Sequence, residues 1–174
     1  MKHGFRVMDS DLHTMEPDDL WERYLDEPFR PFAPRFNRAQ TGPPNQPTIR
    51  IGALAIGEMT VRPSSVRAAA DLHRRSFARH PHYERAHACG YDARSHLEAM
   101  DIEGLDVAVL YGTRGRQVQM HDELDPALAA ALARAHNDWT RDFCAGSPDR
   151  LKFAAQVAFH DVGDRKSTRL NSSH

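Results

Sequence analysis

The pattern Asp-x-Asp-x-His at residues 9–13 constrains this chain more than any other segment. It follows a short apolar run typical of a β-strand, and successive strand residues face opposite sides. Asp9, Asp11 and His13 are therefore expected to share one face of that strand. A carboxylate and an imidazole two residues apart can bind one divalent cation, since both ligand types suit zinc or manganese. A strand followed by a plain polar turn is the alternative, because a short motif alone is not specific.

Apolar runs alternate with helical patterns along the chain, which favours an α/β fold. Strands are predicted near residues 6–11, 106–111 and 153–159. Helices are predicted to start at Pro17, to cover Ser95–Glu103 with Gly104 as the cap, and to run from Asp125 until Gly146. Strands and helices in this order form parallel βα units with right-handed crossovers. We therefore expect three adjacent parallel strands with helices on one side of the sheet.

A stretch rich in proline and glycine, residues 37–90, is expected to be a loop excursion that contains one candidate strand, Ile49–Ile56. Histidines are frequent in its second half and just beyond, at His73, His80, His82, His87 and His96. Such tracts sometimes bind metal, but no cysteine or carboxylate spacing here matches a structural zinc site. A variable polar loop is therefore the favoured interpretation.

Three segments, taken in order along the chain, form a recognisable set of sequence motifs. The first is DSDLHTMEPDDLWERYLDEPFRPFAPR at residues 9–35, and the second is LEAMDIEGLDVAVLY at residues 97–111. The third begins with Asn137-Asp138-Trp139 and ends with Pro148-Asp149-Arg150-Leu151. Together they resemble the metal-dependent amidohydrolases, in the branch similar to aminocarboxymuconate-semialdehyde decarboxylase. The resemblance covers most of residues 5–163, and residues 37–90 match least.

This resemblance implies the N-terminal part of a (β/α)8 TIM-like barrel, incomplete, with parallel strands inside and helices outside. It also implies that Asp11 and His13 are the first two ligands of a divalent metal ion, zinc or manganese. The commonest family pattern has histidine at the position of Asp11, and a carboxylate there favours the harder manganese ion. Asp9 is expected to be structural or to orient a ligand.

The implied activity is metal-dependent hydrolysis, or non-oxidative decarboxylation, of a small carboxylated or cyclic substrate. The family's general base is usually an aspartate on the last barrel strand, and that segment is absent from this chain. The catalytic and substrate-binding residues are therefore unknown. The alternative is a truncated fragment that has no catalytic function of its own.

Four further residues are candidates for a role in the site. Glu16 either contributes charge at a helix N-terminus or faces the active site, and the sequence leaves both open. His160 is expected not to be a ligand, because its position matches a non-ligand position of the family. Asn137 and Trp139 belong to a family motif but lie on a predicted helix, so packing and capping are the expected roles.

Length, net charge and cysteine content limit which fold, partners and cellular compartment are expected for this chain. The chain has 174 residues, short of the roughly 250 of a complete barrel. Its net charge of −1 suggests no nucleic-acid or membrane partner, and a small-molecule substrate is expected. Two cysteines without a CxxC motif, and no signal peptide, favour free thiols in the cytoplasm. A homo-oligomer of the full-length protein is compatible with these features.

Residues 164–174, DRKSTRLNSSH, match the translation of a common sequencing adapter. They are expected to be a non-native tail without packed contacts, and residues 1–163 are expected to be the N-terminal portion of a longer protein.

Overall fold

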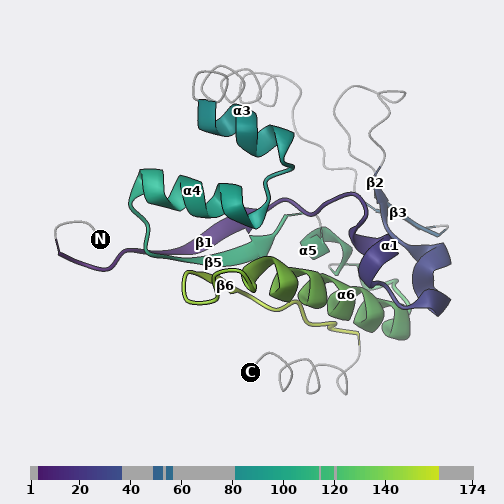
Figure 1. Ribbon diagram of the computed structural model, residues 1–174. Coiled ribbons are helices and arrows are strands. Elements are labelled where there is room, and N and C mark those ends of the chain that lie inside the picture. The colour runs from purple at the N-terminus through teal and green to yellow at the C-terminus, as the bar shows by residue number, and fades with distance from the viewer. Residues whose placement is uncertain are drawn as a thin grey trace, which may run out of the picture.

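The computed structural model describes residues 4–36, 49–52, 54–56, 81–113, 115–119 and 121–160. A parallel sheet in the order β1-β5-β6 lies at the centre, made of β1 (Met8–Thr14), β5 (Val107–Gly112) and β6 (Leu151–Phe153). A smaller antiparallel sheet contains β2 (Arg35–Phe36), β3 (Ile49–Ile51) and β4 (Leu54–Ile56). The smaller sheet lies beside α1 (Leu20–Tyr24), and Ile51 shares a core cluster with Leu20 and Trp21 (Figure 1).

Two helices connect the parallel strands, and an aspartate caps the start of each; Asp125 and the terminal Gly104 were predicted, whereas Asp92 was not. In α4 (Ala93–Glu103), the Asp92 carboxylate accepts a hydrogen bond from the Ser95 amide at 2.8 Å. Gly104 ends this helix with a φ of 73°, a left-handed conformation that glycine adopts without a Cβ clash. In α6 (Pro126–Cys144), Asp125 caps the first turn by accepting from the Leu128 amide at 3.0 Å.

The described residues also form three more short helices. They are the 3-10 helix η1 (Glu27–Phe32), α3 (Pro81–Ala88) and α5 (Gly115–Val118). The last of these directly follows β5 at the carboxyl end of the parallel sheet.

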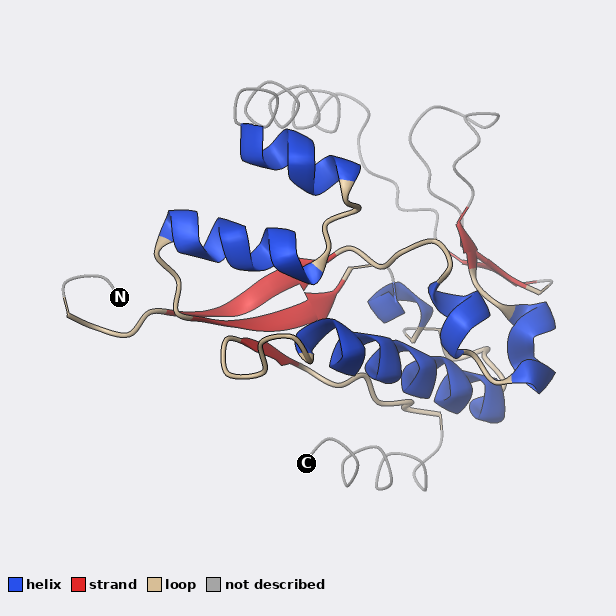
Figure 2. Ribbon diagram, viewed as in Figure 1, coloured by secondary structure: helices blue, strands red, loops and turns tan. Residues whose placement is uncertain are grey.

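The helices α4 and α6 cover the same face of the parallel sheet and run alongside it (Figure 2). Ala108 and Leu110 of β5 belong to one core cluster with Met100 of α4 and Cys144 of α6. The two helices also touch each other, since the rings of His96 and Phe143 meet edge to face with centroids 5.3 Å apart. Because the strand order follows the chain order and both helices lie on one side, the two crossovers have the same hand, as consecutive parallel βα units do.

A second core cluster lies where α1 packs on α6. It joins Leu20, Trp21 and Leu25 with a buried stripe of α6, formed by Leu128, Leu132, Ala135 and Trp139. These α6 residues recur at three- or four-residue spacing, the period that places apolar side chains on one side of a helix. The packing role expected for Trp139 is confirmed, because its side chain is buried in this cluster.

The strand predictions are confirmed for one strand and need correction for two. β5 lies within one residue of its predicted bounds, whereas β1 begins and ends later than residues 6–11. The prediction of a strand at 153–159 is wrong beyond Phe153. The Ala154 amide still donates to the Leu110 carbonyl of β5 at 3.0 Å, but beyond it the backbone bonds to α6, since the Gln156 amide donates to the Asn137 side chain at 2.7 Å.

Three other predictions also need correction. The helix expected to begin at Pro17 begins at Leu20, because residues 17–19 form a turn instead. Ile49–Ile56 is not one strand but the hairpin of β3 and β4, which bends at Gly52, whose φ is 57°. Residues 81–88, expected to be loop, form α3. Residues 37–48, 53, 57–80 and the tail 164–174, with His73 and His80, lie outside the described residues.

Both cysteines are free, and the fold makes them chemically different. Cys144 is buried beside the sheet, and burial raises the pKa of its thiol to about 11. At pH 8 only about one Cys144 thiol in a thousand would be ionised, and the thiolate is the reactive form. Cys89 is exposed. We expect a thiol-specific reagent to modify one cysteine in the native protein and two after denaturation. Modification of Cys144 at the same rate as Cys89 in the native protein would contradict this packing.

Candidate functional site

A β-bulge interrupts β1 within the Asp-x-Asp-x-His pattern. Between Asp9 and Leu12 the strand advances three residues while β5 advances two. The Asp9 carboxylate accepts a hydrogen bond from the Asp11 amide at 2.9 Å, which stabilises the bulge. The bulge reverses the alternation of side chains along β1. The Asp9 position therefore belongs to the face of the sheet that the helices cover, and the His13 position belongs to the opposite face. The expectation that all three residues share a face is therefore wrong for Asp9, whose contact is structural.

Asp11 and His13 remain together on the face away from the helices. The His13 Nε2 atom lies 3.7 Å from Asp11 Oδ1, with 41% of the His13 side chain and 78% of the Asp11 side chain exposed. Two ligands of one tetrahedral zinc ion, each about 2.0–2.1 Å from the metal, lie roughly 3.3 Å apart. The pair therefore fits two neighbouring positions around a divalent cation. Among the described residues, no group of three or more histidine, cysteine or acidic side chains is placed to hold a metal.

The end of β5 approaches His13 from the neighbouring strand. The rings of Tyr111 and His13 lie with centroids 6.4 Å apart. The Thr113 hydroxyl donates to the backbone carbonyl of Thr14 at 2.6 Å and lies 3.5 Å from His13 Nδ1. On the helix side, His96 Nε2 lies 3.4 Å from the His13 carbonyl oxygen. Both the backbone and the ring of His13 thus have polar neighbours.

Glu16 and His136 form a buried pair where β1 and β5 end. The side chains are 2% and 1% exposed, and Glu16 Oε1 lies 3.3 Å from His136 Nε2. The same oxygen accepts a hydrogen bond from the Gly115 amide at 2.8 Å. His136 is held in turn by Thr140, whose hydroxyl oxygen lies 3.4 Å from Nδ1. The Glu16 carboxylate therefore joins β1 to α6 and to the first residue of α5, at the N-terminus of that short helix.

The space for this pair depends on glycines at the end of β5. A Cβ atom added at Gly112 would lie 2.4 Å from His136 Nε2 and 2.7 Å from Glu16 Oε1. One added at Gly115 would lie 2.5 Å from His136 Cδ2. Side chains at these two positions would therefore displace the buried pair.

The sequence motifs did not indicate that His136 or Gly115 belongs to this region. His136 directly precedes the Asn137-Asp138-Trp139 motif and lies one helical turn after Leu132. A polar residue at that position of an apolar stripe is buried, and a buried polar group needs a partner. This signal could have identified His136, but nothing in the sequence indicated that the partner is Glu16.

Asn137 and Gln156 join α6 to the chain that follows β6. The Asn137 side chain donates to the Gln156 carbonyl at 2.8 Å and accepts from the Gln156 amide at 2.7 Å. The role of Asn137 is therefore structural, as expected, although it crosslinks two segments and caps no helix. The side-chain amide of Gln156 is buried and has no hydrogen-bond partner among the described residues.

The hydrogen-bond partner of His160 is not a member of the Asp11–His13 pair. Its Nε2 atom lies 2.6 Å from the carbonyl oxygen of His121, and its Nδ1 atom is buried without a partner among the described residues. A ring nitrogen this close to a carbonyl oxygen carries a proton and cannot bind a metal.

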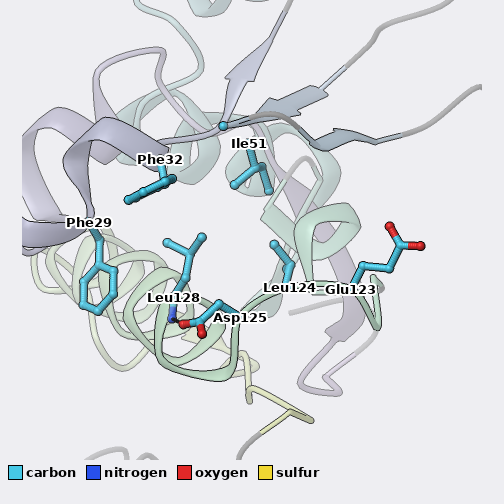
Figure 3. Close-up of a pocket in the computed structure, with 8 residues that line it drawn as sticks. Phe29, Phe32, Ile51, Glu123, Leu124, Asp125 and Leu128 are labelled. Atoms are coloured by element: carbon cyan, nitrogen blue, oxygen red, sulfur yellow. Dashed lines mark hydrogen bonds between the residues drawn. The ribbon is translucent and has the colours of Figure 1, made fainter.

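A separate apolar cavity of about 300 Å³ lies between η1, β3 and the start of α6 (Figure 3). Phe29, Phe32, Ile51 and Leu128 contribute much of its lining. The acidic residues at its edge are turned elsewhere, since Asp125 caps α6 and Glu123 points away from the apolar side chains. The cavity contains none of the residues of the Asp-x-Asp-x-His pattern.

Comparison with known proteins gives one informative result. No protein-family model and no curated protein matches the chain. Among solved structures, the chain is similar to the crystal structure of the amidohydrolase map2389c from Mycobacterium avium subsp. paratuberculosis K-10. The TM-score is 0.61 at 18% identity, and the match covers 98% of this chain and 48% of that chain.

This similarity concerns the fold. The parallel three-stranded sheet with its helices is consistent with part of a TIM-type amidohydrolase fold, and the chain spans about half the length of that neighbour. The barrel itself is not formed by the described residues. None of the described helices is long and apolar enough to cross a membrane.

Substitution of Gly112 tests the tight packing around Glu16 and His136. We expect Gly112→Ala to lower the free energy of unfolding by about 1–3 kcal/mol, because the added methyl group must displace a buried side chain. Gly146→Ala is the matched control, since a Cβ there meets no atom within 4 Å. Urea denaturation of both variants measures the difference. Equal stability of the two variants would show that the pair tolerates displacement.

Proposed function

We propose that the complete protein is a metal-dependent hydrolase of the amidohydrolase superfamily. The observation that carries this proposal is the position of Asp11 and His13, exposed and adjacent toward the carboxyl end of a parallel strand. Active sites of α/β barrels lie at that end of the strands, where side chains from several strands meet. The fold similarity to an amidohydrolase supports the same assignment.

Asp11 and His13 would hold the cation, which would supply an activated water or polarise a bond of the substrate. Tyr111 and Thr113 border the same open face and would contact whatever lies beside the cation. Further ligands and the general base must come from other residues, because the described part of the chain offers no third metal-binding side chain near the pair.

The same site would serve non-oxidative decarboxylation in the branch similar to aminocarboxymuconate-semialdehyde decarboxylase. The supporting observation is the ordered set of three motifs at residues 9–35, 97–111 and 137–151. In either chemistry the substrate is a small carboxylated or cyclic molecule. The rival proposal is that this chain is a fragment without activity of its own.

Metal binding by the chain tests the role proposed for Asp11 and His13. We expect Asp11→Asn and His13→Ala each to weaken zinc or manganese binding at least tenfold, because each removes one donor of the pair. Asp149→Asn is the matched control, since Asp149 is exposed and precedes β6 at the opposite end of the sheet. Isothermal titration calorimetry measures the affinities. Unchanged affinity in both site variants would show that the motif is structural.

Turnover provides the second test. A two-ligand site binds its cation weakly, since catalytic zinc sites normally offer three protein ligands. We therefore expect residues 1–174 alone to show no metal-dependent hydrolysis or decarboxylation, and the full-length protein to show one of them. Metal-dependent turnover by the 174-residue chain that disappears in His13→Ala would contradict the first expectation.

A further inference from the structure

The buried His136 ring is held in one position by its neighbours. Its Nδ1 atom lies 3.4 Å from the Thr140 hydroxyl oxygen, and its Nε2 atom lies 3.3 Å from Glu16 Oε1. The Trp139 ring meets it edge to face, with centroids 5.5 Å apart. Because the ring is packed into the core face of α6, it provides a fixed point at the middle of this helix.

The Glu16 carboxylate links this ring to the ends of two strands. Glu16 follows Thr14, the last residue of β1, and its Oε1 atom accepts a hydrogen bond from the Gly115 amide at 2.8 Å. In the turn before Gly115, the Thr113 hydroxyl donates to the Thr14 carbonyl at 2.6 Å. The end of β1 and the turn after β5 are thus joined through the backbone at Thr14 and through the buried pair.

The Asp11–His13 pair lies next to these contacts. The His13 ring has Asp11 Oδ1 3.7 Å from Nε2 and the Thr113 hydroxyl oxygen 3.5 Å from Nδ1. Asp11 and His13 belong to β1, whereas Thr113 follows β5. The arrangement of the groups around the His13 ring therefore depends on how the two strand ends are held relative to each other.

Packing alone does not explain why position 136 is polar. His136 lies in the buried stripe of α6, one helical turn after the fully buried Leu132. Replacement of a buried ionisable pair by apolar residues of similar volume is often neutral or stabilising. Glycines leave the space that the pair occupies, since an added Cβ would lie 2.4 Å from the ring at Gly112 and 2.5 Å from it at Gly115. This retention of a polar pair favours a role in the neighbouring site.

We propose that His136 is a positioning residue that acts through Glu16. It fixes the end of β1 relative to the turn after β5, and so holds Asp11 and His13 in the arrangement that binds one divalent cation. The proposal rests on the proposed function for the identity of the bound group, whereas the arrangement is a property of the metal-free chain. A purely structural His136 would affect metal binding no more than any other core residue of α6 whose loss costs the same stability.

Three substitutions on α6 separate these roles. His136→Leu removes both ring nitrogens, whereas His136→Gln retains a side-chain NH group that can reach Glu16. Leu132→Ala is the matched control, because Leu132 is buried on the same helix and has no polar group to hold Glu16. Urea denaturation measures the stability that each variant loses. By isothermal titration calorimetry, we expect His136→Leu to bind zinc or manganese about tenfold more weakly, and the other two variants to bind within about threefold of the wild-type protein.

Amide ¹H–¹⁵N spectra of the metal-free proteins provide a measurement that does not depend on the metal. The hydrogen-exchange rate of the Gly115 amide reports its bond to Glu16, and the amide signals of Asp11 and His13 report the arrangement of the proposed ligands. We expect His136→Leu to exchange the Gly115 amide faster and to move the Asp11 and His13 signals. In Leu132→Ala these signals should stay in place.

The outcomes for the two proposals are distinguishable. Unchanged metal affinity in folded His136→Leu overturns the positioning role, and so does an equal loss of affinity in Leu132→Ala. A loss in His136→Gln as large as that in His136→Leu counts against the contact with Glu16 as its cause. If the wild-type protein binds no metal, the proposed function fails, and the spectra alone decide: moved Asp11 and His13 signals in His136→Leu support the positioning role, and unmoved signals overturn it.

A milder variant keeps the proposal testable if His136→Leu does not fold. Thr140→Val removes only the hydroxyl oxygen beside His136 Nδ1 and lies on α6, away from β1. We expect it to weaken metal binding and to move the Asp11 and His13 amide signals in the same direction. Unchanged affinity and unchanged signals in Thr140→Val would then overturn the proposal.

Discussion

The buried carboxylate of Glu16 is the group on which the arrangement of the strand ends depends. Glu16 lies three residues after His13. Its carboxylate oxygen accepts a hydrogen bond from the Gly115 amide and lies next to the His136 ring. A carboxyl group can be buried only where partners replace the hydrogen bonds that it made to water, and removal of one partner leaves the other without its hydrogen bond. The end of β1, the turn after β5 and the middle of α6 are therefore held together at one point.

The bulge in β1 places the polar side chains of the Asp-x-Asp-x-His pattern on different faces of the strand. Asp9 turns back to accept the Asp11 amide, while Asp11 and His13 remain on the face away from α4 and α6. In a closed barrel, side chains on this face point to the interior and those on the other face pack against helices. The described sheet has only three strands, and the solved amidohydrolase that it resembles is about twice as long as this chain.

Helix caps and apolar periodicity in the sequence predicted those helices and strands whose formation depends mainly on neighbouring residues. Asp125 was available as a cap, Gly104 allowed a left-handed end, and the apolar stripe of α6 had the period of a helix. The continuous apolar run Val107–Tyr111 was recognisable as the strand that became β5, Val107–Gly112. The prediction failed at residues 154–159, because an apolar run does not specify whether its backbone bonds to a strand or to the side chain of Asn137.

For the candidate site, the sequence alone determined that carboxylates and an imidazole are concentrated at one end of a parallel strand. Only the tertiary structure decided which of them face the same way, because a one-residue bulge reverses the alternation and leaves no reliable trace in composition. The tertiary structure also brought Glu16 to His136, and Thr113 to His13. These partners lie 120 and 100 residues apart in the chain, so no local pattern connects them. Their contacts exist because parallel strands end at the same edge of a sheet.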